Sequence, residues 1–494
     1  MARLTRLGRA AFAASVASVT IAADAPIPLP PAEKPAAADV QSAPSPATGA
    51  MPIDLPTALR LVDENSPTIA VARARVDEAY ARQQQAEVLW LPTLQTGVRY
   101  FRVDGREQAS DGVIFTVSKS NLFAAAGASL RVNVADAIYL PLATRRLTDA
   151  AAASARATVN ATQLDAALAY LDLLEAYGRL AVNADTLARA EDTLRRSIIA
   201  DEAGLSRTKA DISRIRTEVE SRRQERIEIE GRASVASARL AQLTLLPPCC
   251  ELRPADVCVL PLTLVPPCPC DELVSVANAN RPELAAFRSV TGAAAERLRQ
   301  AKAEPLLPKV SFDYAGGTFG GGRNDDMSRF DGRSAVGAAL TWELRNMGLG
   351  YRAEVRERQA QVGVASQRVR ELQAQVAAEV AANAKLSDAR LRSLTPAQAA
   401  VREALELYRR LLESSFGVAG QRGQLDTVEP LLAIQALNQA RIAYLTAVVD
   451  YDRAQFRLFT ALGQPPSCAL PGQPQAIDVP AAPPPPPAKS DKPS

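Results

Sequence analysis

Cysteine carries most of the chemical potential in this 494-residue chain, because the sequence contains no histidine. The absence of histidine removes the commonest general base, the commonest metal ligand and every Ser-His or Cys-His arrangement. Five of the six cysteines fall between Cys249 and Cys270 in a proline-rich stretch, and the sixth is Cys468. We expect one or two disulfides that pin an irregular connector. A zinc site is the less favoured alternative, because the spacing is not C-x2-C.

Two other groups of residues invite a chemical interpretation. The glycines at 316–317 and 320–322 could form a phosphate-binding loop, but no lysine or helix follows them, so an exposed loop is expected. Asp325 and Asp326 are interpreted as solvated side chains rather than a metal site. The net charge of +3 is small for this length and argues against a nucleic-acid surface. We predict no enzyme activity, no cofactor, no metal site and no nucleic-acid partner.

The elements that would position functional residues come in two similar sets. Asn65-Ser66-Pro67 recurs as Asn280-Arg281-Pro282, and Leu91-Pro92 recurs as Leu307-Pro308, in each case about 215 residues later. A repeat of this length indicates an internal duplication of a helix-helix-strand unit rather than a short solenoid period. The fold must therefore be built from two similar halves.

Each half supplies two segments in which apolar and polar residues alternate. Polar loops such as Asp104–Gly112 and Gly320–Arg333 join them. Alternation of this kind is typical of the apolar-out, polar-in strands of a membrane barrel, although a soluble sandwich would alternate too. The four predicted strands are 93–100, 126–134, 309–315 and 336–344. The residues expected to face lipid are Val310, Phe312, Tyr314, Leu340 and Trp342, and those expected to face the lumen are Lys309, Asp313 and Glu343.

Long helices are predicted after the second strand of each half. Segments 136–201 and 351–416 are rich in strong helix formers, and about 65 residues at ~1.5 Å each would make rods of roughly 100 Å. Each rod ends at a glycine-marked turn and returns as a second helix, over 208–245 and 425–463. Pro396 and Pro430 are expected to interrupt these helices.

Four strands cannot close a barrel, since the smallest filled barrels have ~8. An open sheet with a lipid-facing side would leave unpaired backbone groups in hydrocarbon. The chain must therefore oligomerise. Two copies would give eight strands with a filled lumen, and three would give twelve, enough for a water-filled pore.

The termini look like segments outside the folded region. Arg3, Arg6 and Arg9 precede a short uncharged run, which is the order of a secretory signal peptide. No other stretch approaches the ~18–20 apolar residues of a membrane-spanning helix, so any crossing of a bilayer must use strands. The predicted divisions are a signal peptide at 1–25, a Pro/Ala-rich linker at 26–52, a first repeat at 53–246, a Cys/Pro-rich connector at 247–270, a second repeat at 271–466 and a disordered tail at 467–494.

Residues 53–466 resemble the TolC-type outer-membrane efflux and secretion channels. The resemblance rests on the duplicated Asn-x-Pro and Leu-Pro motifs, on the passage from Leu340-Thr341-Trp342-Glu343-Leu344 to Arg352-Ala353-Glu354-Val355, and on the last helix. That helix carries Leu425-Asp426-Thr427-Val428, Gln435-Ala436-Leu437, Asp450-Tyr451 and Ala461-Leu462-Gly463.

The resemblance implies an α+β membrane protein in the outer membrane with a periplasmic extension. It implies a homotrimer that shares one twelve-stranded barrel, in contact with outer-membrane lipid, continued by a coiled-coil tunnel of twelve helices. In such channels the tip meets a periplasmic membrane-fusion adaptor, which couples it to an inner-membrane pump of the resistance-nodulation or ATP-driven class. The expected function is a passive exit duct for efflux or type I secretion. The alternative is a soluble periplasmic coiled-coil adaptor or scaffold.

The two helical turns are the expected periplasmic tip and adaptor contact. Asp211 and Asp426 occupy matching positions in the return helices and would form rings at the constriction that favour cations. The equally weighted alternative is that they only stabilise helix N-termini. The residues assigned to the tip are Gly204, Leu205, Ser206, Arg207, Gly417, Gly420 and Gly423.

Overall fold

The computed structural model describes residues 50–202, 209–256, 259–323, 326–416 and 428–469. The predicted signal peptide and most of the linker and of the C-terminal tail lie outside these ranges. So do residues 203–208 and 417–427, which carry every predicted tip residue and Asp426.

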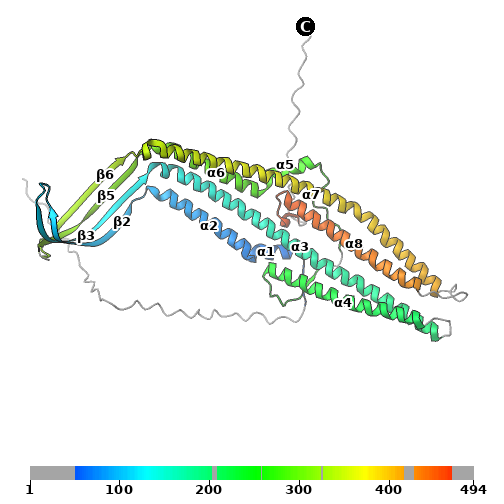
Figure 1. Cartoon of the computed structure of the whole chain (residues 1–494). Coiled ribbons are helices and arrows are strands. Elements are labelled where there is room, and N and C mark those ends of the chain that lie inside the picture. Colours follow the sequence, from blue (N-terminus) through cyan, green and yellow to red (C-terminus); the bar gives the residue numbers. More distant parts are fainter. Residues whose placement is uncertain (1–49, 203–208, 257–258, 324–325, 417–427, 470–494) are drawn as a thin grey trace, which may run out of the picture. The chain divides into compact units, whose positions relative to one another are not determined.

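The order of the elements repeats once along the chain, as the internal duplication predicts (Figure 1). The first half consists of β1 (Met51–Ile53), α1 (Leu55–Asn65), α2 (Pro67–Glu87), η1 (Val88–Trp90), β2 (Thr93–Gln108), β3 (Ile114–Asn133), α3 (Val134–Glu202) and α4 (Lys209–Thr244). After β4 (Leu252–Pro254), the second half consists of α5 (Cys270–Asn280), α6 (Pro282–Ala303), η2 (Glu304–Leu306), β5 (Lys309–Arg323), β6 (Asp331–Thr341), η3 (Arg345–Gly348), α7 (Leu349–Phe416), α8 (Val428–Ala461) and η5 (Pro466–Ala469).

The two Asn-x-Pro motifs make the same junction between short helices. Ser66 ends α1 with φ −62° and ψ 122°, and Arg281 ends α5 with φ −63° and ψ 120°. A residue before proline avoids the helical region, while proline itself suits the first position of the next helix. Pro67 and Pro282 accordingly begin α2 and α6. The motif therefore bends the chain at equivalent points in both halves.

Two very long helices follow the strands, in agreement with the sequence. α3 has 69 residues and α7 has 68, so each would measure roughly 100 Å at ~1.5 Å per residue. α3 packs beside α2, α4, α6 and α8, and α7 beside α5, α6 and α8 (Figure 1). None of the described helices combines the length and apolarity that a membrane-spanning helix requires.

The expected interruptions at two prolines are wrong. α7 continues through Pro396, and Pro430 is the third residue of α8. A proline inside a helix costs about 3 kcal/mol because one hydrogen bond is lost. The packing of α7 along α8 offsets this cost at Pro396. Pro430 costs little because the first turn of a helix has no internal partner for its N–H groups.

The four main strands form one antiparallel sheet in the order β2-β3-β5-β6. All four strands are longer than predicted, and the loops are correspondingly shorter than Asp104–Gly112 and Gly320–Arg333. β6 begins at Asp331 rather than at residue 336, but it ends at Thr341, before the predicted end at residue 344. β2 and β3 together pair from Thr93 with Ser129 to Gln108 with Ile114. Alternation of side chains marks only the half of each strand next to the helices, whereas backbone pairing carries the outer half.

Hydrogen bonds, most of them made by backbone groups, hold the described part of the connector. β1 pairs with β4 in parallel, and the N–H of Leu252 donates to the Ser237 hydroxyl at 2.8 Å. All five cysteines in the described residues are free thiols, which corrects the expectation of a disulfide staple here. No group of three or more metal-ligating side chains comes together in the described parts of the chain.

Side chains of α8 hydrogen-bond to the later part of the connector, over residues 262–265. The Asp452 carboxylate accepts the N–H of Leu262 at 2.7 Å, and the Gln455 side chain accepts the N–H of Val265 at 2.9 Å. The Tyr451 hydroxyl lies 3.0 Å from the Thr263 hydroxyl. Burial raises the pKa of Asp452 to about 7. These side chains satisfy backbone groups that would otherwise lack a partner in an irregular segment.

The hydrophobic core lies where the helices pass the connector. One cluster joins α1, α3, α4 and α8 to β1 and β4, with Tyr170 and Phe456 as its largest members. A second joins α5, α6, α7 and α8 around Phe459. The sheet has no comparable core within the chain, because most of its apolar side chains are exposed.

Candidate functional site

The strand register gathers the predicted lipid-facing residues on one face of the sheet. Val310 is paired with Leu340, and Phe312 and Tyr314 follow at every second position of β5. Successive side chains of a strand point to opposite faces, so these four residues share a face. Trp342 follows the last residue of β6 and is 60% exposed. Other exposed apolar residues on the face are Leu94, Val98, Tyr100 and Val336.

The opposite face is polar and carries paired charges. Arg131 lies 3.5 Å from the Asp313 carboxylate, and Lys119 donates to Glu107 at 2.7 Å. Lys309 pairs with Glu343 across the ends of β5 and β6. The predicted lumen residues Lys309 and Asp313 therefore lie on the face away from Val310, as expected from the alternation.

Both edges of the sheet are open within the chain. β2 and β6 are the outer strands, and neither has a second partner among the described residues. Every residue of β6 is exposed, and all of β2 except Val103. An open edge presents a row of unpaired N–H and C=O groups that is ready to bind another strand. The sheet is thus complete only if further strands pair with both edges.

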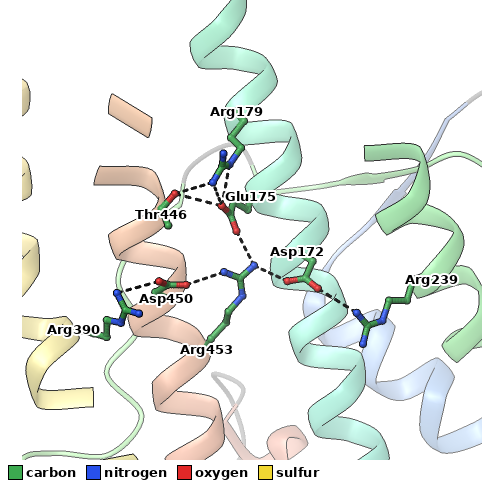
Figure 2. Close-up of polar contacts among 8 residues, drawn as sticks. All are labelled: Asp172, Glu175, Arg179, Arg239, Arg390, Thr446, Asp450 and Arg453. Atoms are coloured by element: carbon green, nitrogen blue, oxygen red, sulfur yellow. Dashed lines mark hydrogen bonds and ion pairs between the residues drawn. The ribbon is translucent and has the colours of Figure 1, made fainter. Parts of the chain in front are cut away.

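A network of ion pairs joins the long helices beside the core (Figure 2). The Arg453 guanidinium on α8 contacts Asp172 at 2.5 Å and Glu175 at 2.7 Å, both on α3, and Asp450 at 3.0 Å on its own helix. Each carboxylate also has a second arginine partner. These are Arg239 of α4 at 3.7 Å from Asp172, Arg179 of α3 at 2.7 Å from Glu175 and Arg390 of α7 at 3.2 Å from Asp450.

Electrostatics in the network favour the charged forms. Burial tends to raise the pKa of Glu175, but hydrogen bonds from Arg179 and Arg453 outweigh it and hold the pKa below its ordinary value. Burial likewise tends to lower the pKa of Arg453, and Glu175 and Asp172 outweigh that effect. The network therefore acts as a charged tie between α3 and α8, with links to α4 and α7.

Of the predicted gate and tip residues, only Asp211 lies within the described ranges. It is in the first turn of α4, is partly exposed and lies 3.4 Å from Arg214. A carboxylate in the first turn of a helix is favourable in either interpretation, because the helix dipole is positive there. Its role at a gate therefore stays a prediction, as do the roles of Asp426 and the tip residues.

Sequence reasoning missed two groups of interacting residues. The first is the Arg453 network, whose signal is a set of charges on helix faces otherwise rich in alanine. The second is a cluster of Phe123, Phe319 and Arg333 on the polar face of the sheet. Phe123 and Phe319 fall in the outer halves of strands that the alternation did not mark, so no pattern brought them together.

Comparison with solved structures places the fold among outer-membrane channels. The chain is similar to the outer-membrane channel OprN, with a TM-score of 0.69 and 18% identity, over 83% of this chain and 89% of that chain. It is also similar to the outer-membrane protein VceC of Vibrio cholerae, with a TM-score of 0.68 and 18% identity, over 83% and 96% of the two chains. A third similar structure is the CmeC outer-membrane channel of Campylobacter jejuni, with a TM-score of 0.69 and 14% identity, over 83% of this chain and 85% of that chain.

No protein-family model matches the sequence, and no curated protein matches it. At 14–18% identity the likeness concerns the fold, and at that level it confirms the resemblance to TolC-type channels. The structures that share the fold are outer-membrane channels and not enzymes, in agreement with the sequence-based prediction.

Proposed function

We propose that this chain is the outer-membrane exit channel of a tripartite efflux or type I secretion system. Three copies share one twelve-stranded barrel, and their long helices form a tunnel that extends into the periplasm. The channel is passive: it opens through a periplasmic membrane-fusion adaptor and receives substrate from an inner-membrane pump of the resistance-nodulation or ATP-driven class.

The observation that carries the proposal is the four-stranded sheet with one apolar face and two open edges. In hydrocarbon each unsatisfied N–H or C=O group costs several kcal/mol, so the edges must be paired. Pairing β6 of one chain with β2 of the next satisfies both edges of every chain and closes the sheet. The apolar face then meets lipid and the polar face lines the lumen, as in known barrels.

Three copies explain the sheet better than two. Eight strands enclose an interior that side chains just fill. The polar face here bears charged pairs such as Arg131 with Asp313, which are exposed and need water. Twelve strands leave room for that water, and an open lumen suits a fold shared with solved outer-membrane channels.

Mass measurement of the detergent-solubilised particle tests the assembly. We expect three times the mass of the mature chain, recovered from the outer-membrane fraction. A protein released in soluble form by osmotic shock would instead support the alternative function, a periplasmic coiled-coil scaffold. A stable folded monomer in detergent would refute the closed barrel.

Conductance in planar bilayers tests the predicted gate. If Asp211 and Asp426 form rings at the constriction, replacing both with asparagine reduces the preference for cations in the purified trimer. If they only stabilise helix N-termini, the double variant keeps its ion preference and loses about 0.3–1 kcal/mol per site in stability. The two outcomes are distinguished by measuring reversal potential and thermal stability on the same preparation.

A further inference from the structure

Four residues, one from each strand, meet on the polar face of the sheet. Arg99 of β2 is opposite Phe123 of β3, and Phe123 is opposite Phe319 of β5. The two rings lie 6.3 Å apart between centroids and are tilted by 60°. The guanidinium carbon of Arg333, on β6, lies 5.0 Å from the Phe319 centroid and 5.7 Å from that of Phe123.

A glycine permits this arrangement. Gly317 is the cross-strand partner of Arg333, so no side chain stands between Arg333 and the two rings. A Cβ at Gly317 would lie 2.0 Å from the carbonyl oxygen of Ala124, so the close approach of β3 excludes any larger residue. Stacking on aromatic rings holds Arg333 in place while leaving its N–H groups exposed.

Carboxylates lie near this cluster, but none among the described residues forms an ion pair with its arginines. Several other basic residues of the face have acidic partners, such as Arg131 with Asp313 and Lys119 with Glu107. Arg99 and Arg333 have no carboxylate partner among the described residues. Asp331 lies two residues from Arg333, but it accepts the N–H of Gly332 instead. The cluster thus presents two guanidinium groups beside two aromatic rings, and these four residues form a band across the sheet.

We propose that Arg99, Arg333, Phe123 and Phe319 form a selectivity site for organic anions in the barrel. This inference rests on the proposed function, in which the polar face lines a water-filled lumen. Guanidinium groups bind carboxylate, sulfonate and phosphate oxygens through two parallel hydrogen bonds. The phenyl rings contact the apolar part of the same solute, so anions with an aromatic group are favoured over small anions. In a trimer the band becomes a ring of six arginines and six phenylalanines.

Ion selectivity of the purified trimer in a planar bilayer tests the charge. We compare the wild type with Arg99→Gln/Arg333→Gln by measuring the reversal potential across a bilayer that separates two KCl solutions of different concentration, both on the order of 0.1 M. At that ionic strength the Debye length is about 10 Å, so the arginine charges still act on ions in the lumen. Each charge lost near the ion path should lower the preference for chloride over potassium about threefold in water-like surroundings. Arg102→Gln is the matched control, because Arg102 is on the same strand but on the opposite face, where it pairs with Asp104 at 2.5 Å.

Block of the current by an aromatic anion tests the rings. Benzenesulfonate should block the wild type more strongly than methanesulfonate, and Phe123→Ala/Phe319→Ala should remove that difference. Arg99→Lys/Arg333→Lys should keep the preference for chloride but weaken block, since lysine cannot bind two oxygens in the same plane. Trimer mass is measured for each variant to exclude misfolding.

Two results overturn the inference alone, and a third overturns it together with the proposed function. Trimers that conduct with the same selectivity in the wild type and the Arg99→Gln/Arg333→Gln variant refute the anion site and leave the proposed channel intact. So does equal block by the two sulfonates. A protein that forms no trimer in detergent refutes the proposed function and removes the lumen site with it.

Discussion

Replacement of Arg453 by methionine should destabilise the helical part of the protein. The guanidinium is mostly buried, with 17% of its side chain exposed, and it contacts three carboxylates. Methionine has a similar length and fills the space, so the main effect is the loss of charge compensation. Removing one partner of a fully buried ion pair costs about 3–5 kcal/mol.

The cost should be smaller here, about 2 kcal/mol per chain, because the network is partly redundant. Glu175 keeps Arg179 at 2.7 Å, and Asp450 keeps Arg390 at 3.2 Å. Asp172 is 37% exposed, so water partly compensates its carboxylate for the lost ion pair with Arg453. For a chain of this length we expect the melting temperature to fall by roughly 2–4 °C.

Thermal unfolding of the trimer in detergent, followed by the helical circular dichroism at a fixed scan rate, measures this change. Arg410→Gln is the control, because its pair with Glu406 on α7 is highly exposed and worth at most about 0.5 kcal/mol. A shift no larger in Arg453→Met than in this control would refute the network as a stabilising tie.

The effect should also depend on pH. The pKa of Glu175 is lowered from its ordinary value of 4.5, so the folded state binds fewer protons than the unfolded chain in the acidic range. Its stabilisation is therefore complete above about pH 4.5 and is lost as the pH falls through the lower folded-state value. The difference between the wild type and Arg453→Met should shrink below pH 4.5. A constant difference from pH 7 to pH 3 would contradict this account.

Three further predictions concern the junction, the sheet and the tip. Gly463→Ala should lower the free energy of unfolding by about 1–3 kcal/mol, because a φ of +88° is strained for alanine and the Cβ would lie 2.8 Å from the carbonyl carbon of Asn280 in the Asn-x-Pro junction. Its control in thermal unfolding is Gly363→Ala, which has open space around it and should be neutral or stabilising by up to about 1 kcal/mol. Leu340→Arg on the apolar face should cost about 2–4 kcal/mol in the membrane, whereas Ala339→Arg on the polar face should mainly change ion selectivity; equal losses of stability would contradict the assignment of the faces. Leu205→Glu should abolish export while leaving the trimer mass unchanged, and normal efflux in that variant would mean that the adaptor docks elsewhere.

The long helices and the duplication were predictable because their signals are local and redundant. Dozens of consecutive strong helix formers outweigh one unfavourable residue, which is why α7 tolerates Pro396. The Asn-x-Pro junction depends on proline geometry, which acts on the preceding residue wherever it occurs. The face of each strand was also predictable, because Val310, Phe312 and Tyr314 alternate over a period of two.

The outer halves of the strands were not predictable from the same pattern. Beyond Phe101 and before Ala124 the face shared with Val98 carries polar residues such as Asp104 and Ser118, which hydrogen-bond to each other at 2.7 Å. Apolar and polar residues alternate where one face of a strand must be shielded from water. The alternation is absent where both faces can contact water. Backbone pairing continues there without any pattern in the side chains. The cluster of Phe123 and Phe319 lies in this region and was missed for that reason.

The segment Asp450-Tyr451-Asp452-Arg453 unites several of these features in four residues of α8. Residues three apart lie on the same side of a helix, so Asp450 and Arg453 both take part in the network with α3. Tyr451 and Asp452 instead contact the connector. The two faces respond to pH in opposite directions. Burial raises the pKa of Asp452 to about 7, so ionising it costs stability as the pH rises from about 4 to 7, whereas Glu175 beside Arg453 gains stability on ionising. The helix therefore joins the connector and the ion network most firmly where Glu175 is charged and Asp452 is still neutral, at mildly acidic pH.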